Sequence, residues 1–178
     1  MSKEINWQPN NRENGVLKLQ PLTPDDFEAL YACASDPLIW EQHPVPDRYR
    51  REVFRHYFDS ALESNGAFLI LNKVSGKIIG CTRFYDYQPG NSAIVIGYTF
   101  FTREYWGGPY NRLSKELLID YAFQFVENVY FYIGAGNIRS QRATAKLGAI
   151  RVKDVYSEGM SPQLLHFEYR IQKNEWIG

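Results

Sequence analysis

Residues 96–111 read IGYTFFTREYWGGPYN and place an apolar run directly before a glycine-rich turn. The run belongs to a predicted strand over Ala93–Thr102, and a predicted helix follows the turn and continues to about Asn128. Glycines at Gly107 and Gly108 let the backbone approach a ligand closely, and the free amides in the first turn of a helix favour an anion. The junction therefore predicts an anion site, or alternatively a glycine turn that holds no ligand.

A second strand-to-helix junction follows later in the chain. A short buried strand is predicted over Val129–Ile133, and the sequence GAGNIRS at residues 134–140 leads into another helix. Taken alone, Asn137 is typical of a helix N-cap and Gly148 of a helix C-cap. In this order and at this spacing, however, the two junctions together are no longer generic.

The remaining elements alternate between helical and strand periodicity. We expect one domain over residues 15–178, preceded by a flexible N-terminal arm over residues 1–14. Further helices are predicted from Thr23 and over Asp47–Ser64, separated by an irregular proline-rich segment over Asp36–Pro46. Further strands are predicted at Val16–Leu22, Ala67–Leu71, Lys77–Tyr87 and Leu164–Ile171. The order βααβββαβαββ is an α+β arrangement with a central antiparallel meander.

The composition excludes several classes of protein. Twenty Lys and Arg residues balance twenty Asp and Glu residues, which argues against a protein dedicated to nucleic-acid phosphates. Two cysteines, Cys33 and Cys81, exclude a disulfide framework and favour a cytoplasmic location. No run approaches ~18 apolar residues and the N-terminus has no apolar segment, so we expect neither a membrane partner nor a secretory signal.

Motifs of other enzyme classes are absent from the sequence. The three histidines, His43, His56 and His166, are scattered, so no zinc motif is present and we expect no metal. Neither a GxSxG nucleophile turn nor a GxxxxGK[ST] phosphate loop occurs.

The two junctions resemble the acyl-CoA-binding half of the GNAT N-acyltransferase superfamily, and the nearest branch is similar to the ribosomal-protein N-terminal acetyltransferases. The matching stretches are DPLIWE (36–41), IGYTF (96–100), YWGG (105–108), LIDYAF (118–123), NIRS (137–140) and KLG (146–148). The resemblance covers residues 15–171 and rests on the order and spacing of these stretches. It implies a three-layer α/β/α fold around a mixed, largely antiparallel sheet that is splayed in the middle.

The resemblance also implies acetyl-CoA as co-substrate. The pantetheine arm would lie between the strand at Ile94–Thr102 and the strand at Val129–Ile133, pairing with the strand edge. The residues implied for coenzyme binding are Phe100, Phe101, Thr102, Gly107, Gly108, Tyr110, Asn111, Arg112, Asn137 and Ser140. Pro109 stands where the family has a glycine, and the side chain of Asn111 could replace the amide that is lost. Glu104 must point away from a pyrophosphate or be paired.

Acylation of an amine needs a neutral amine and can use an acid to protonate the leaving thiolate. Many superfamily members supply a tyrosine acid where this chain has Thr144. In the branch that the chain resembles, Asn and Ser at the start of the last helix take up the thiol end. The resemblance thus implies Ser140 as donor to the sulfur and Asn137 as a positioning group, unless both only cap the helix. Candidates for the base are Glu41, His43, Glu104, Asp86 and Tyr98, with Glu41 taken as the catalytic candidate.

These observations favour an acetyl-CoA-dependent N-acetyltransferase that acts directly on a primary amine, as a monomer or homodimer. The alternative is a non-catalytic acyl-CoA-binding module, and Pro109, Glu104 and Thr144 keep it open. A small nucleotide-binding regulator is a third possibility, but the glycine turn lacks a phosphate-binding lysine. The acceptor is a protein N-terminus or a small-molecule amine, such as a polyamine, an amino acid or an antibiotic. The basic cluster Arg48–Arg51 is interpreted as a solvated face, or as a contact for an acidic acceptor or the coenzyme 3′-phosphate.

Overall fold

The computed structural model describes residues 4–157 and 163–178. Within these residues eight strands form one sheet in the order β1-β2-β3-β4-β5-β6-β8-β7. The strands are β1 (Arg12–Glu13), β2 (Leu17–Pro21), β3 (Ala67–Asn72), β4 (Ile78–Gln88), β5 (Ala93–Phe101), β6 (Asn128–Gly134), β7 (Ile150–Tyr156) and β8 (Leu165–Gln172). The α-helices are α1 (Phe27–Ala34), α2 (Arg51–Glu63), α3 (Tyr110–Ala122) and α4 (Ile138–Ala145).

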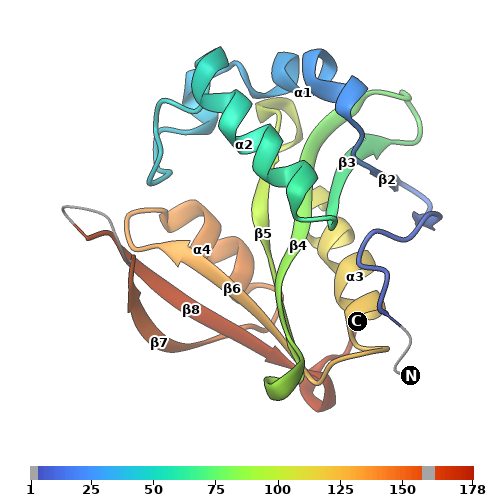
Figure 1. Cartoon of the computed structure of the whole chain (residues 1–178), viewed down its shortest axis with the longest axis vertical. Coiled ribbons are helices and arrows are strands. Elements are labelled where there is room, and N and C mark those ends of the chain that lie inside the picture. Colours follow the sequence, from blue (N-terminus) through green and yellow to red (C-terminus); the bar gives the residue numbers. More distant parts are fainter. Residues whose placement is uncertain (1–3, 158–162) are drawn as a thin grey trace.

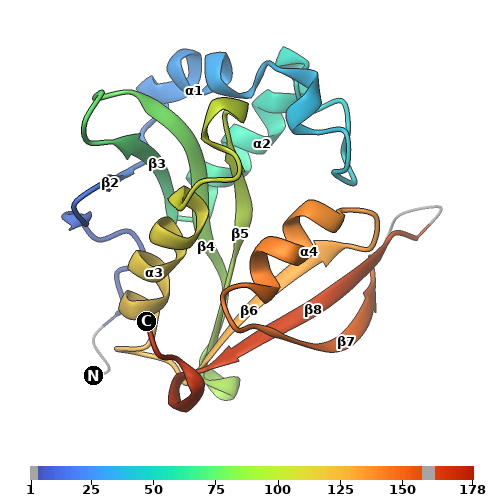
Figure 2. The ribbon, with the colours of Figure 1, turned by 180° about the vertical axis from the view of Figure 1, so that it is seen from behind.

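The sheet is the middle of three layers. Helices α1 and α2 cover one face, and α3 and α4 cover the other (Figures 1 and 2). Successive strand residues point to opposite faces of the sheet. The side chains of Phe68 and Ile70 therefore pack on the face that α3 covers, and those of Ala67 and Leu69 pack on the face that α1 and α2 cover. Among the described strands, β5 and β6 pair in parallel and the other pairings are antiparallel. The predicted α+β class and largely antiparallel sheet are confirmed.

The sheet is splayed between β5 and β6. These strands pair only where Ala93–Val95 meets Asn128–Tyr130, and beyond this point they diverge (Figure 1). On its other side β5 carries a bulge, because the register with β4 shifts between Arg83↔Gly97 and Cys81↔Phe100. Tyr98 sits in this bulge with a φ of 51°. A bulge bends and twists its strand, and this one lies in the part of β5 that leaves β6.

The helix boundaries differ from the sequence predictions at three places. Helix α2 begins at Arg51, later than predicted, because the four preceding residues form a turn. Helix α3 ends at Ala122, well before Asn128, since a tight turn in which the Phe125 amide donates to the Ala122 carbonyl (2.9 Å) leads into β6. Helix α1 begins at Phe27 and not at Thr23, because Pro24–Asp26 form a short 3-10 helix before it.

The segment before β1 packs against the body of the protein. The Trp7 ring lies 5.2 Å from the ring centres of both Phe84 and Tyr87, and the Tyr121 hydroxyl donates to the Asn6 carbonyl (2.6 Å). Residues 1–3 lie outside the described residues, and the division of the chain at residue 14 stays a prediction. Among the described helices, none is long and apolar enough to cross a membrane.

Candidate functional site

A cleft of about 760 Å³ occupies the opening between β5 and β6. Its walls come from the loop before α2, the bulged half of β5, the glycine turn, the end of β6, and the start of α4. The volume is in the range of small-molecule and coenzyme sites. The splay therefore brings both junctions predicted from the sequence to one cavity.

The glycine turn forms one end of this cleft. Gly107 has a φ of +74°, a conformation that strains residues with a side chain, and a Cβ on Gly108 would lie 2.9 Å from the Tyr110 ring. The Leu113 amide bonds to the Pro109 carbonyl (2.9 Å), so the preceding amides of α3 have no partner within the helix. Gly107, Gly108 and Asn111 line the cleft, which places an anion-favouring helix start at its wall.

The other residues implied for coenzyme binding divide into two groups. Phe100 and Phe101 line the cleft, and the Phe101 carbonyl accepts a hydrogen bond from the Trp106 indole (3.0 Å). Thr102, Tyr110 and Arg112 lie outside the lining, and the Thr102 amide donates to the Ile79 carbonyl (2.9 Å). The implied roles of Thr102, Tyr110 and Arg112 in coenzyme binding stay predictions.

Arg112 and Glu104 are turned away from the cleft. The Arg112 guanidinium pairs with Glu116 (Nε–Oε1, 2.7 Å). Glu104 is exposed and outside the lining, as a pyrophosphate at the glycine turn requires.

Asn137 and Ser140 both line the cleft from the start of α4. The Asn137 side-chain oxygen accepts from the Ser140 amide (3.2 Å), so Asn137 is the N-cap of the helix. The Ser140 hydroxyl has no hydrogen-bond partner among the described residues and is therefore not part of the cap. The capping alternative applies to Asn137, whereas the Ser140 hydroxyl is available to a ligand.

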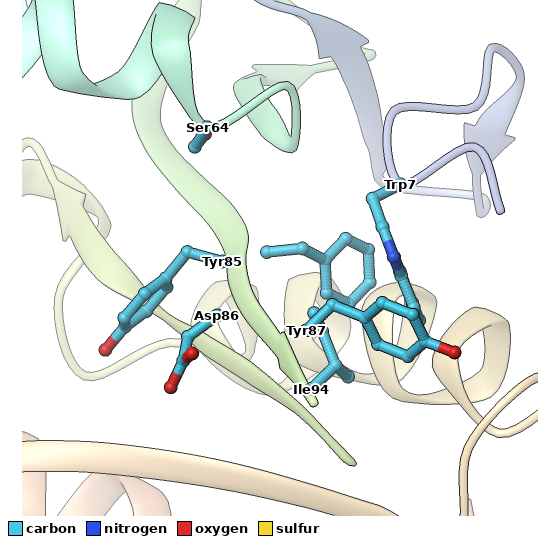
Figure 3. A pocket seen from close by; sticks show the side chains of 7 residues that line it. Trp7, Ser64, Tyr85, Asp86, Tyr87 and Ile94 are labelled. Carbon is cyan, nitrogen blue, oxygen red and sulfur yellow. The ribbon is translucent and has the colours of Figure 1, made fainter. Parts of the chain in front are cut away.

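The five base candidates are not equivalent. Glu41 lies outside the lining with a 52% exposed side chain, 3.8 Å from the Arg139 guanidinium. Asp86 lines a separate pocket of about 60 Å³, where it projects from β4 on the side opposite Trp7 (Figure 3). Of the five, only His43 and Tyr98 line the cleft.

His43 is held in its neutral form. Burial, with a smaller contribution from the charge of Arg48, lowers the pKa of His43 from 6.5 to about 3. Its Nδ1 atom accepts from the Val45 amide (2.9 Å).

Lys115 is a candidate that the sequence analysis missed. It is 4% exposed, lines the cleft, and donates from Nζ to the hydroxyls of Thr99 (2.5 Å) and Thr82 (3.3 Å). Burial lowers its pKa from 10.5 to about 7, so a substantial fraction is neutral near pH 7. The available signal was its place on the face of α3 shared with the buried Leu118 and Ala122.

The basic cluster Arg48–Arg51 is not one solvated face. Arg50 and Arg51 are exposed and pair with Glu52 and Glu28. Arg48 is 8% exposed, lines the cleft, and stacks on the Trp40 and Tyr57 rings at 5.1 and 5.0 Å. Its position in the cluster gave no sign of this burial.

Within residues 4–157 and 163–178, no group of three or more His, Cys, Asp or Glu side chains could hold a metal ion.

Comparison with known proteins agrees with this architecture. A family model described as the acetyltransferase (GNAT) domain matches residues 17–150. A structure from T. thermophilus, described as that of a proposed acetyltransferase, is 25% identical to this chain. Its TM-score is 0.76, and the match covers 94% of this chain and 92% of that one. A search of curated protein sequences gave no match.

Two structures from Vibrio cholerae share the fold at lower identity. A spermidine N-acetyltransferase, solved with CoA and spermine, is 13% identical with a TM-score of 0.70, covering 93% of this chain and 100% of its own. A protein described as a proposed ribosomal-protein-serine acetyltransferase is 13% identical with a TM-score of 0.71. This match covers 90% of this chain and 95% of that one. Because the family model spans well over half of the sequence, the chain belongs to the GNAT family of N-acetyltransferases.

Proposed function

We propose that this protein transfers the acetyl group of acetyl-CoA directly to a primary amine in the cleft between β5 and β6. The amine nitrogen would form a bond to the thioester carbonyl carbon, the carbon–sulfur bond would break, and the thiolate would take up a proton. The observation that carries the proposal is the meeting of the glycine turn, the unpaired edge of β5 and the start of α4 at one cavity.

The residues at this cavity fit an acyl-CoA. Gly107, Gly108 and the free amides of α3 supply donors for a pyrophosphate without a side chain in the way. Beyond Val95 the β6-facing edge of β5 is not paired with β6, which leaves backbone groups near Phe100 and Phe101 for an extended pantetheine arm. Ser140 would donate its free hydroxyl to the sulfur, and Asn137 would fix the helix that positions it.

The proton of the amine needs an acceptor inside the cleft. We assign this part to Lys115 acting through Thr99, because Thr99 lines the cleft and its hydroxyl lies 2.5 Å from Nζ. A lysine whose pKa is lowered to about 7 by burial is suited to accept a proton at neutral pH. Glu41, which the sequence analysis favoured, is outside the lining and beside Arg139.

The acceptor is an amine on a small molecule or a protein N-terminus, and we place the reaction in the cytoplasm. The location is supported by Cys33 and Cys81, which are both unpaired thiols.

Calorimetry with acetyl-CoA and a screen of primary amines test the proposal. We expect acetyl-CoA to stabilise the fold by about 2.7 kcal/mol at a hundredfold excess over its dissociation constant. We also expect release of free thiol when a suitable amine is added. Absence of both a thermal shift and a binding heat at millimolar coenzyme would refute acetyl-CoA dependence.

A further inference from the structure

Arg48 places an uncompensated positive charge at the wall of the cleft. It is 8% exposed, and within the described part of the chain its guanidinium contacts one polar side chain, His43, with Nη1 3.1 Å from Nε2. Arg83 is also buried, and its polar contacts are to the Ser60 hydroxyl (3.2 Å). Among the described residues neither arginine pairs with a carboxylate, although buried cations normally have such a partner.

The contact between Arg48 and His43 does not satisfy either group. A neutral imidazole has one ring nitrogen that donates and one that accepts. Because Nδ1 of His43 accepts from the Val45 amide (2.9 Å), the proton lies on Nε2. The Nε2–H group and the Nη1–H group of Arg48 are then two donors side by side, with no acceptor between them.

The described residues that line the rest of the cleft supply no acceptor with a negative charge. Within the described residues, the lining contains Arg48, Lys115 and Arg139 but no Asp or Glu. Two of the lining rings that could hold an ammonium group already face the chain's own cations, since Arg83 lies 3.5 Å from the Tyr98 ring centre and Arg139 lies 3.9 Å from the Trp106 ring centre. The positive charge at this part of the cleft attracts an anion and repels a polycation.

The coenzyme's pyrophosphate would be held elsewhere. Arg48 stacks on Tyr57 of α2, on the α1–α2 face of the sheet. The glycine turn leads into α3, which covers the opposite face (Figure 2). Arg48 and His43 are therefore on the side of the cleft left for the acceptor.

We propose that Arg48 and His43 form a subsite for a carboxylate and that the acceptor is a small amine carrying a carboxylate group, as an amino acid does. The inference rests on the proposed acetyl transfer and narrows its acceptor. One carboxylate oxygen would accept from the Arg48 guanidinium and the other from Nε2–H of His43. The bound anion would compensate the buried charge and direct the amine toward the splay.

Matched acceptors test this subsite. Free thiol release from acetyl-CoA is followed with amino acids, with the amides of the same amino acids, with the corresponding decarboxylated amines, and with spermidine. We expect the wild-type kcat/KM to be at least about tenfold higher for the acid than for its amide, since hydrogen bonds to a charged group are stronger than neutral ones. Arg48→Met and His43→Asn should each reduce this ratio, with Arg48→Met abolishing most of it.

Arg50→Met is the matched control, because Arg50 is exposed, pairs with Glu52 and lies in the same loop. It should leave the acid-to-amide ratio unchanged. If Arg48→Met does not fold, Arg48→Lys keeps the charge but loses the planar fork and should still lower the ratio. Calorimetric titration of the amino acids, with and without CoA, gives a direct measure of binding that does not depend on turnover.

Several results would overturn the inference. The inference is wrong if the wild type uses the amides or spermidine as well as or better than the amino acids. It is also wrong if Arg48→Met leaves the acid-to-amide ratio unchanged, or if no carboxylate-bearing amine is bound or acetylated. Loss of acetyl-CoA affinity in Arg48→Met, with an unchanged ratio, would assign the arginine to the coenzyme. Failure of the wild type to bind acetyl-CoA would instead refute the proposed function, and the amino-acid titrations would still decide whether the subsite exists.

Discussion

Replacing Lys115 with methionine removes a buried ammonium group while nearly preserving the volume of the side chain. The lysine is 4% exposed, and its polar partners are the hydroxyls of Thr99 and Thr82. Burial lowers its pKa from 10.5 to about 7. Between these values the unfolded chain binds more protons than the folded one, so the free energy of unfolding rises with pH.

The size of this rise follows from the two pKa values. At pH 7 the folded lysine is about half protonated and the unfolded one almost fully, and at pH 9 the folded lysine is almost neutral. One pKa unit corresponds to about 1.4 kcal/mol, so the wild type gains about 2 kcal/mol from this group between pH 7 and pH 9. Lys115→Met lacks the group and should lack this gain.

Urea unfolding of both proteins at pH 7, 8 and 9 measures the difference. The thiols of Cys33 and Cys81, whose pKa values are raised by burial, are common to both proteins and largely cancel in the comparison. Lys77→Met, which removes an exposed lysine, should retain the wild-type rise. Parallel curves for the wild type and Lys115→Met would show that the Lys115 ammonium is solvated or paired, and the assignment of Lys115 as proton acceptor would then lose its basis.

Three other substitutions test the remaining parts of the site. In calorimetry, Gly107→Asp should weaken acetyl-CoA binding by more than Gly107→Ala does. Both substitutions strain the backbone at the φ of +74°, but only Asp adds a negative charge. Equal effects of the two substitutions would exclude a phosphate at this turn. Ser140→Ala should lower kcat by ~10²-fold with an unchanged melting temperature. Asn137→Ala should instead lower the free energy of unfolding by about 1 kcal/mol through loss of the helix cap. A Ser140→Ala protein with full turnover would leave the acid unidentified. Trp7→Ala should lower the free energy of unfolding by about 2 kcal/mol, since the half-buried ring packs on Phe84 and Tyr87, and an unchanged urea midpoint would show that these contacts contribute nothing.

Local signals in the sequence were sufficient for the order of the elements from β2 onward, but they missed β1 (Arg12–Glu13), which lies in the segment predicted as a flexible arm. Thr23 followed by Pro24 and two aspartates predicted a helix start, and the Thr23 amide and hydroxyl both donate to Asp26 (2.7 and 2.8 Å). The glycine turn and the Asn137 junction were also found where predicted. Only the family resemblance predicted that these two junctions meet at one cavity, because the splay depends on contacts between strands that are far apart in sequence.

The parts that could not be predicted depend on tertiary contacts. Nothing in the local pattern around Tyr98 indicates a bulge, which arises from the register with β4. Arg48 belongs to a cluster that is otherwise exposed, and only the packing of its loop against Trp40 and Tyr57 buries it. Lys115 carried a local signal, as a lysine on an apolar helix face, but its hydroxyl partners lie on β4 and β5.

Mass spectrometry of the acceptor after incubation with acetyl-CoA tests the central claim most directly. The reaction mixture contains the protein, acetyl-CoA and the panel of primary amines, and free CoA is measured in parallel. Direct transfer predicts an acetylated amine and free CoA in equal amounts, with a carboxylate-bearing amine as the best acceptor. Bound acetyl-CoA that yields no acetylated amine with any member of the panel would contradict the account.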